Sequence, residues 1–262
     1  MADQARLCVT NQKGGVGKTT VAINLAGALN DRGREVLFVD LDPQGNATEG
    51  LGFVDAYDED PPTILDALLD PEGVAVEELI RDHPEMDVLP SSIDMTAAEA
   101  TLLQEPDGEA KLATLLDSAA SSYDYVVVDC PPQLGMLTDN ALYAARNLVV
   151  PALAESTSKR ALELLYDYVA ALEDEHGVRI DTRALVINRI ETTGEARSMV
   201  EWFEDAMEDV PTAKVRKRVA LQRAFSARRS IFAVDEDVDM REEFAELATM
   251  IDEEFSRTEV IA

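Results

Sequence analysis

The stretch that most restricts what this chain can fold into is NQKGGVGKTT, residues 11–20. It follows a β-rich run, RLCVTN, and leads into TTVAINLAGALNDRG, whose apolar residues recur at helical spacing. Its second half matches the phosphate-loop pattern G-x-x-x-x-G-K-[ST], but Gln12 stands where the first glycine is expected and Lys13 follows it. The stretch therefore predicts a strand, a phosphate-binding loop and a helix, and it leaves Lys13 as a second lysine that needs an explanation.

The residue types in the loop suit a nucleotide. Glycines let the backbone approach a phosphate closely, and the helix that follows turns its positive end toward the anion. We expect Lys18 to reach the outer phosphates and Thr19 to place its hydroxyl on Mg²⁺. A later apolar run, YDYVVVDCPP, ends in Asp129, the acid expected to hold that metal through water. A flexible glycine turn is a poor alternative, because strand, loop, helix and strand-ending acid occur in the right order.

Near-continuous apolar runs, typical of strands buried on both faces, occur at 6–11, 35–43, 123–132, 147–153 and 182–190. Helical periodicity separates these runs, most clearly at 158–177, while residues 51–121 contain mainly short amphipathic stretches. The alternation predicts a three-layer α/β fold, with a mostly parallel, twisted sheet, helices on both faces and ligands beyond the carboxyl ends of the strands. No Gly/Ser/Pro-rich linker divides the chain, so we expect residues 1–262 to form one domain.

Three sequence blocks resemble a known family. KGGVGKTT, DLDPQGNAT (40–48) and DCPPQLGMLTDNAL (129–142) together closely resemble the ParA/Soj group of the deviant Walker A ATPases, a group that also includes MinD. The pair formed by Asn188 and Arg189 and the segment 215–231 extend the resemblance over nearly the whole chain. The combination is highly specific for the family and less specific for the cargo.

The resemblance implies a P-loop ATPase that uses ATP or ADP and Mg²⁺, with the site residues assigned as follows. It implies that the nucleotide is bound by Lys13, Gly14, Gly15, Val16, Gly17, Lys18, Thr19, Thr20, Asn188 and Arg189. It implies catalytic roles for Lys13, Lys18 and Asp42, and a metal site formed by Thr19, Asp40 and Asp129. It also implies a switch segment that contains Pro131, Pro132, Gln133 and Gly135 and responds to the γ-phosphate.

The resemblance also explains the second lysine. In this family two subunits bind ATP face to face, and the lysine matched here by Lys13 reaches the partner's nucleotide, which makes the homodimer depend on ATP. A cation supplied in trans neutralises charge on the transferred phosphoryl group, as an arginine finger does. Asp42 matches the family's water-positioning acid, and Asp40 is expected to support the metal through its water shell. Asn188 matches an adenine contact, although on sequence alone it could equally cap a strand end.

The charge of the chain is strongly acidic, with 52 acidic and 23 basic residues and a formal net charge of −29. Such a field repels nucleic acid and anionic membranes on average, and it keeps a protein soluble in concentrated salt. We therefore hypothesise that the protein belongs to a halophile with a high-salt cytoplasm.

One segment departs from this acidic background. Residues 212–234 contain no acid and seven bases: Lys214, Arg216, Lys217, Arg218, Arg223, Arg228 and Arg229. The resemblance implies that this basic segment lies beside the nucleotide and contributes to a non-specific DNA surface in the ATP dimer. Arg216, Arg223 and Arg228 replace the family's proline, acid and glycine, which adds charge but leaves the proline's role near the adenine in question. Alternatively, part of this charge pairs with the protein's own acids.

Two alternatives come from other functional classes. A MinD-like ATPase that cycles on membranes would end in a basic amphipathic helix, whereas the apolar stripe Phe244, Leu247, Ile251 and Phe255 has an acidic polar face and is expected to pack on the sheet. An iron–sulfur carrier on the same fold would need paired cysteines, but Cys8 and Cys130 are isolated and are expected to be buried thiols. A metabolic enzyme would need a substrate pocket that the sequence does not reveal.

The sequence thus predicts a partitioning ATPase. In the prediction, the ATP dimer binds DNA non-specifically, and a ParB-like or other cargo-adaptor protein stimulates slow basal hydrolysis. No run of 18 apolar residues and no secretory start is present, so we expect a cytoplasmic, nucleoid-associated protein without membrane binding. Because only about ten residues precede the loop, no N-terminal helix-turn-helix is expected. The sequence leaves open whether the cargo is a chromosome, a plasmid or a protein assembly.

Overall fold

A computed structural model describes residues 4–118, 122–234 and 238–259. In these residues seven strands form one sheet in the order β3-β2-β4-β1-β5-β6-β7, and every neighbouring pair is parallel. The strands are β1 Ala5–Val9, β2 Val36–Asp40, β3 Asp87–Leu89, β4 Tyr125–Asp129, β5 Asn147–Leu153, β6 Asp181–Ile190 and β7 Thr212–Arg216. The strand order reverses at β1, and ligands of such sheets bind beyond the carboxyl ends of the strands at this point.

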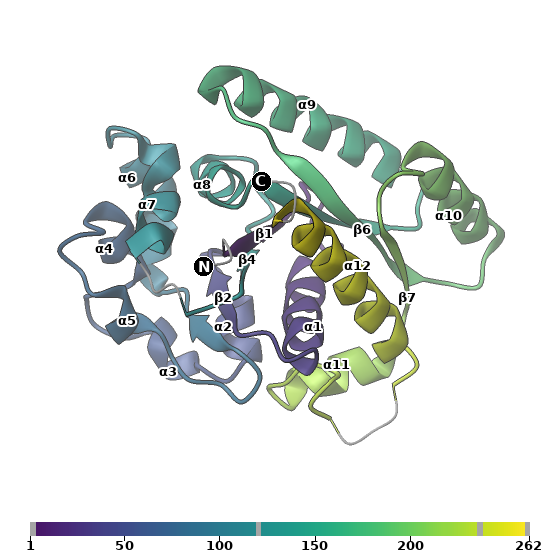
Figure 1. Ribbon diagram of the computed structural model, residues 1–262, viewed down its shortest axis with the longest axis horizontal. Coiled ribbons are helices and arrows are strands. Elements are labelled where there is room, and N and C mark those ends of the chain that lie inside the picture. The colour runs from purple at the N-terminus through teal and green to yellow at the C-terminus, as the bar shows by residue number, and fades with distance from the viewer. Residues whose placement is uncertain (1–3, 119–121, 235–237, 260–262) are drawn as a thin grey trace.

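Helices cover both faces of the sheet (Figure 1). One face is covered by α1 Lys18–Asp31, α2 Asn46–Gly50, α11 Val219–Ser226 and α12 Arg241–Glu259. The other face is covered by α4 Ile64–Leu69, α5 Val76–Leu79, α6 Ala98–Leu102, α7 Lys111–Ser118, α8 Met136–Ala145, α9 Ser158–His176 and α10 Gly194–Ala206. The remaining elements are α3 Val54–Tyr57 and the 3-10 turns η1 Ile93–Ala97 and η2 Gly108–Ala110. The predicted three-layer α/β fold is confirmed.

The sequence pattern missed the strands at the two edges of the sheet. β3 interrupts the region expected to be mainly helical, and its three residues are too few to show a period. β7 forms the start of the basic segment, where Ala213 and Val215 point inward and the alternate residues Lys214 and Arg216 stay exposed. Edge strands commonly carry such outward charges because these oppose pairing with another chain. The last three residues of the helical pattern expected up to residue 121 lie outside the described residues.

The predicted buried stripe of the C-terminal helix is confirmed. Phe244, Leu247 and Ile251 are fully buried, and α12 lies alongside α1 (Figure 1). Phe255 packs edge-on against Tyr125 of β4, with 5.9 Å between the ring centroids. The apolar face of α12 is therefore occupied by the protein core. Within the described ranges, no helix combines the length and apolar character needed to span a bilayer.

Candidate nucleotide-binding site

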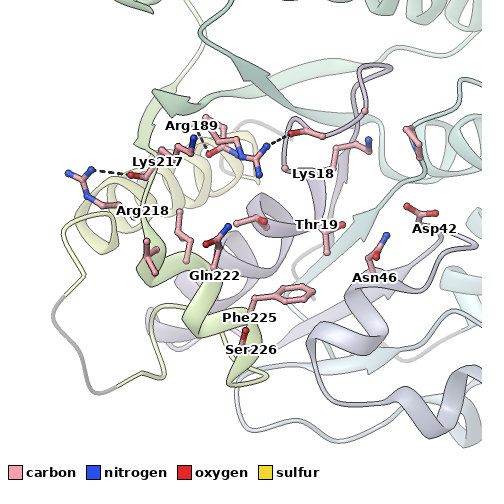
Figure 2. Close-up of a pocket in the computed structure, with 18 of the residues that line it drawn as sticks. Lys18, Thr19, Asp42, Asn46, Arg189, Lys217, Arg218, Gln222, Phe225 and Ser226 are labelled. Carbon is pink, nitrogen blue, oxygen red and sulfur yellow. Dashed lines mark hydrogen bonds between the residues drawn. The ribbon is translucent and has the colours of Figure 1, made fainter. Parts of the chain in front are cut away.

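A cavity of about 890 Å³ lies at the carboxyl ends of the central strands. The loop after β1 forms one wall, the loop after β2 a second, and α11 a third (Figure 2). Figure 2 shows Lys18 and Thr19 between Asp42 on one side and Gln222 and Phe225 of α11 on the other. Small-molecule sites typically occupy about 300–1,000 Å³ and lie at the strand-order switch of α/β sheets, so both the size and the position suit a nucleotide.

The loop needs its glycines for two physical reasons. Gly15 and Gly17 have φ angles of 75° and 90°, a backbone conformation that side chains disfavour. A Cβ atom on Gly17 would also lie 2.3 Å from the amide nitrogen of Asn188. That nitrogen donates a 2.8 Å hydrogen bond to the carbonyl of Val16. The loop is therefore closely packed against the end of β6, which restricts the conformations it can adopt.

Lys18 and Asp129 form the electrostatic centre of the site. The Lys18 side chain is buried, and this burial lowers the pKa of its ammonium, although the charge of Asp129 opposes the shift. Among the described residues, neither carboxylate oxygen of Asp129 has a hydrogen bond of good geometry, although the nearby Thr19 hydroxyl acts to lower the pKa of this carboxyl. Burial, reinforced by the charge of Asp40, raises the pKa of the Asp129 carboxyl well above its ordinary value. A buried carboxylate without a good hydrogen bond is costly, and a cation or a water bound to a cation would relieve that cost.

These residues fit a magnesium ion. No group of three or more His, Cys, Asp or Glu side chains that could hold a metal occurs in the part of the chain that the structure describes. Mg²⁺ does not require such a cage, because it usually keeps several waters and binds one or two carboxylates together with substrate phosphates. The buried carboxylate of Asp129 and the hydroxyl of Thr19, which lines the cavity, supply a donor set of this kind.

Asp40 and Asp42 occupy different environments at the end of β2. Asp40 is fully buried, and its carboxylate accepts hydrogen bonds from the backbone N–H of Asp42 and from the N–H and hydroxyl of Thr48, at 3.1, 2.8 and 2.7 Å. Burial nevertheless raises the pKa of Asp40 to about 6. Asp42 lines the cavity. Asp40 thus holds the loop that presents Asp42, and its predicted support of a metal remains a prediction.

The second lysine of the loop, Lys13, is bound to the segment that follows β5. Its ammonium donates hydrogen bonds to Glu155 Oε2 and Thr157 Oγ1, each at 2.7 Å. Its side chain is 24% exposed, so both contacts lie near the surface. Lys13 is therefore held by its own chain in this structure, whereas Lys18 points into the cavity (Figure 2). The predicted contact with a partner's nucleotide remains a prediction.

Asn188 and Arg189 both donate hydrogen bonds to backbone carbonyls of the phosphate loop. The side-chain Oδ1 of Asn188 accepts the backbone N–H of Arg189 at 2.8 Å, and Arg189 adopts a positive φ of 55°. The Arg189 guanidinium donates a 3.1 Å hydrogen bond to the carbonyl of Gly15. These bonds give Asn188 the contacts of a strand-end cap, which was one of its two sequence interpretations. Since Asn188 also lines the cavity, its predicted contact with adenine is compatible with this position.

The switch segment and α11 both line the cavity, and the sequence did not single out the apolar residues of α11. Of the predicted switch residues, Pro132 lines the cavity, while Pro131, Gln133 and Gly135 continue the chain toward α8. Phe225 reaches across from α11, and a Cβ atom on Gly50 of α2 would lie 2.2 Å from its ring. The apolar spacing of Leu221 and Phe225 on a predicted helix could have revealed this wall, but the dense charge around it obscured the pattern.

Most cations of the basic segment are paired with the protein's own acids. Lys217 bonds Glu191 at 2.8 Å, Lys214 bonds Glu204, and both Arg216 and Arg218 contact Asp239, at 3.3 and 2.7 Å. These pairs account for four of the seven predicted DNA-contact residues, as the second sequence interpretation anticipated. Arg223, Arg228 and Arg229 are exposed at the far end of α11 and just beyond it. Arg216, Lys217 and Arg218 also line the nucleotide cavity, so this segment links the two predicted sites.

The end of the basic segment is fixed on α1. The N–H and hydroxyl of Ser230 both donate to the buried carboxylate of Glu85, and the N–H of Ile231 donates to Asn24 at 2.9 Å. A Cβ atom on Gly27 would lie 2.2 Å from the Ser230 hydroxyl, so the glycine provides the space for this contact. Because α1 begins at the phosphate loop, the basic segment and the phosphate loop both contact the same helix.

The fold and the loop together define a P-loop NTPase of the three-layer α/β type. The AAA domain family AAA_31 matches residues 5–182. Cell division protein PomZ of Myxococcus xanthus is 33% identical over 228 residues, which cover 86% of this chain and 70% of PomZ. The chain therefore belongs to the AAA domain family and to its ParA/MinD-type members.

Other relatives match a shorter part of the chain. Chromosome partitioning protein ParA of Myxococcus xanthus is 44% identical over 163 residues, covering 61% of this chain and 56% of that protein. Sporulation initiation inhibitor protein Soj of Bacillus subtilis is 40% identical over 167 residues, covering 64% of this chain and 65% of Soj. The matched region thus spans less than two thirds of either relative.

Solved structures share the fold over nearly the full chain. The ATP complex of a McdA variant from Cyanothece has a TM-score of 0.84 at 20% identity, covering 96% of this chain and 98% of McdA. Cobyrinic acid a,c-diamide synthase from Mycobacterium smegmatis, crystallised with ADP and magnesium, has a TM-score of 0.76 at 29% identity, covering 94% of this chain and 93% of that protein.

Proposed function

We propose that this protein is a ParA-type partitioning ATPase that hydrolyses ATP to ADP and phosphate. The observation that carries the proposal is the fully buried carboxylate of Asp129 beside the buried ammonium of Lys18, which lines a nucleotide-sized cavity. This arrangement is electrostatically incomplete without a metal and an anion. The relatives named ParA, Soj and PomZ, and the ATP and ADP–magnesium complexes of the structural neighbours, support the same assignment.

The side chains that line the cavity or lie beside it would have different roles in ATP hydrolysis. Lys18 and the N–H groups of the loop would hold the phosphates, and Thr19 and Asp129 would hold Mg²⁺, which neutralises phosphate charge when bound. Asp42 would orient the attacking water, because its carboxylate lines the cavity on the side facing Lys18 (Figure 2). Asn188 and Arg189 would keep the loop in shape and border the base. Within the described residues, Asp42 is the acid that lines this cavity, so we expect slow basal turnover that a partner protein accelerates.

The loop geometry suggests how ATP could control assembly. In a homodimer formed face to face, Lys13 would leave Glu155 and Thr157 and bind the partner's phosphates. Lys13 would then exchange its ion pair with the Glu155 carboxylate for one with a triphosphate, which carries more negative charge. The exchange requires that ATP is bound to the partner. We infer that the deviant loop makes dimerisation conditional on ATP. We further infer that residues 1–262 act as one domain, because the strands between residues 5 and 216 share a single sheet and α12 packs against α1.

The ATP dimer would bind DNA non-specifically through the basic segment and release it when a ParB-like or other cargo-adaptor protein stimulates hydrolysis. The supporting observation is that Arg216, Lys217 and Arg218 line the nucleotide cavity while Arg223 and Arg229 are exposed on the same segment. The nucleotide and the DNA would therefore both contact the basic segment. We propose a nucleoid-associated location, with a chromosome, plasmid or protein assembly as cargo.

The net charge of −29 supports a halophilic setting for this function. At about 1 M salt the screening length is only about 3 Å, so DNA contacts must be short-range and densely spaced. Refolding yield and ATPase activity should peak in molar salt rather than in dilute buffer. A maximum in low salt would contradict the halophilic assignment without affecting the ATPase assignment.

Co-sedimentation tests the proposed function against its alternatives. The protein is incubated with ATP, ADP or no nucleotide, together with plasmid DNA or anionic liposomes, while phosphate release is measured in parallel. We expect phosphate release, and sedimentation with DNA in ATP only. ATP-dependent sedimentation with liposomes would favour a MinD-like function instead. Absence of ATP binding and of phosphate release, in both low and molar salt, would overturn the proposal.

A further inference from the structure

The helix that follows the switch segment, α8, is capped at its start by a side chain from another helix. Gly135 occupies the N-cap position of α8, and it has no side chain that could accept a hydrogen bond from the free N–H groups of the first turn. Glu99 of α6 supplies the acceptors instead. Its Oε2 atom accepts the N–H of Met136 at 2.8 Å, and its Oε1 atom accepts the N–H of Leu137 at 3.3 Å. A carboxylate from another helix therefore holds the point where the switch segment ends.

The glycine at position 135 is explained by this contact rather than by its backbone conformation. Its φ of −171° is extended and open to any residue. However, a Cβ atom at this position would lie 2.8 Å from Oε2 and 3.1 Å from Oε1 of Glu99. Any side chain would thus push the carboxylate away from the N-terminus of α8. The switch segment lacks a side chain at the place where Glu99 has to approach.

Other hydrogen bonds make α8 a firm support. The Thr138 hydroxyl donates to the carbonyl of Gln133 at 2.7 Å, which ties the first turn back to the switch segment. The buried Asn140 side chain donates to the carbonyl of Gly108 in η2 at 2.7 Å and accepts the N–H of Leu112 in α7 at 2.9 Å, which ties α8 to both elements. The segment between Asp129 and Met136 is therefore held at both ends, by β4 and by the capped start of α8. A movement of Pro132, which lines the cavity, would therefore either be confined to the residues between β4 and α8 or displace the Glu99 cap.

We propose that Glu99 is a positioning residue for the switch segment: by capping α8 from α6, it fixes the far end of residues 131–135 so that the γ-phosphate determines their conformation. The proposal rests on the proposed ATPase function. Without the cap, the segment would sample more conformations in either nucleotide state, and its response to ATP would weaken. Nucleotide affinity would change little, because Lys18 lies at the start of α1 and the phosphate loop joins β1 to α1, away from this contact.

The test compares Glu99→Ala, Glu99→Gln and the control Glu105→Ala. Glu105 is similarly half-exposed, lies just beyond α6 and pairs with Lys111 instead of a helix terminus. Hydrogen exchange of residues 131–137 is measured with ATP and with ADP, alongside kcat, KM and the melting temperature. We expect Glu99→Ala to accelerate exchange at Met136 and Leu137 by about tenfold, to remove most of the ATP–ADP difference in the segment, and to lower kcat about fivefold with KM within twofold. Glu99→Gln, which retains an acceptor oxygen, should recover much of this loss, and Glu105→Ala should match the wild type.

Several outcomes would overturn the proposal. They are an unchanged ATP–ADP difference in Glu99→Ala, an equal loss in Glu105→Ala, and a fall in melting temperature without a separate change in kcat. If the wild type binds ATP without hydrolysing it, the ATPase proposal fails while the exchange measurement still decides the role of Glu99. If the wild type does not bind ATP, both proposals fail.

Discussion

The phosphate loop and the basic segment both carry lysines or arginines on an acidic protein, but they satisfy those charges in opposite ways. Lys18 is buried beside an Asp129 carboxylate that lacks a hydrogen bond of good geometry among the described residues. In the basic segment, by contrast, Lys217 and Arg218 are paired with nearby acids in the surface layer. The loop region therefore needs a ligand to complete it, whereas much of the basic segment is already neutralised. The comparison teaches that the sequence locates cations, whereas the tertiary structure decides which of them are already paired with acids.

The largest expected effect separates the two lysines of the loop. Lys18→Ala should weaken binding of a fluorescent ATP analogue roughly 100-fold, because it removes a buried cation from the phosphate site. Lys13→Ala is the matched control, since it removes the same charge from the same loop at a position bound to Glu155. We expect it to bind the analogue within about threefold of wild type but to lose ATP-dependent dimerisation in light scattering. Equal losses of nucleotide affinity in the two variants would contradict the division between them.

The next effect concerns the part of the basic segment outside the cavity. Arg223→Glu combined with Arg229→Glu should weaken ATP-dependent DNA binding at least about tenfold and reduce its dependence on salt, with little change in ATP binding. The control is Arg160→Glu combined with Arg179→Glu, which makes the same charge change on exposed side chains elsewhere. Reversal of Arg216 and Arg218 would be less informative, because both also line the nucleotide cavity. Equal losses in the two double variants would indicate a general charge effect and not a DNA surface.

A smaller effect follows from the raised pKa of Asp129. A carboxyl whose pKa is higher in the folded than in the unfolded protein stabilises the fold below its unfolded pKa and loses that contribution as pH rises through the folded pKa. Without nucleotide and Mg²⁺, Asp129→Asn should therefore melt higher than wild type at pH 7.5, by about 3 °C for each 1 kcal/mol relieved.

The difference in melting temperature between Asp129→Asn and wild type should shrink toward pH 4.5, where the native carboxyl is protonated. Thermal melts over this pH range measure it, and a gap that stays constant or has the opposite sign would contradict the prediction. Adding ATP and Mg²⁺ should reverse the order, because only the wild type retains the carboxylate that fits the metal.

The smallest effect tests the neutralised cations directly. Asp239→Asn removes the acid that pairs with both Arg216 and Arg218, and these arginines hold the pKa of its carboxyl below the ordinary range. We expect DNA affinity in ATP to rise about threefold and to fall more steeply with salt, because released cations can bind phosphates. Glu204→Gln, beside Lys214, offers a parallel release farther from the cavity. A lower or unchanged affinity in both variants would show that the paired cations do not contribute to DNA binding.

The sequence predicted the buried central strands and the phosphate loop, because each produces a signal in consecutive residues. Long apolar runs located β1, β2, β4, β5 and β6, and glycine spacing located the phosphate loop, because a buried strand and a phosphate turn are each encoded by consecutive residues. β3 and β7 escaped prediction since a strand at the edge of a sheet is short or carries polar residues on one face. Their pairing depends on a neighbour distant in the chain.

What the sequence by itself determined is therefore the class of chemistry: the type, order and spacing of Gly17, Lys18, Thr19 and Asp129 predict a phosphate site with a metal. Only the tertiary structure decided which charges are available to ligands. Within the described residues, it left Asp129 without a hydrogen bond of good geometry, engaged Lys13 with Glu155, and paired Arg218 with Asp239. The physical reason is that pairing and burial depend on distances between residues far apart in the chain, so a pattern of neighbouring residues specifies a charge but not its partner.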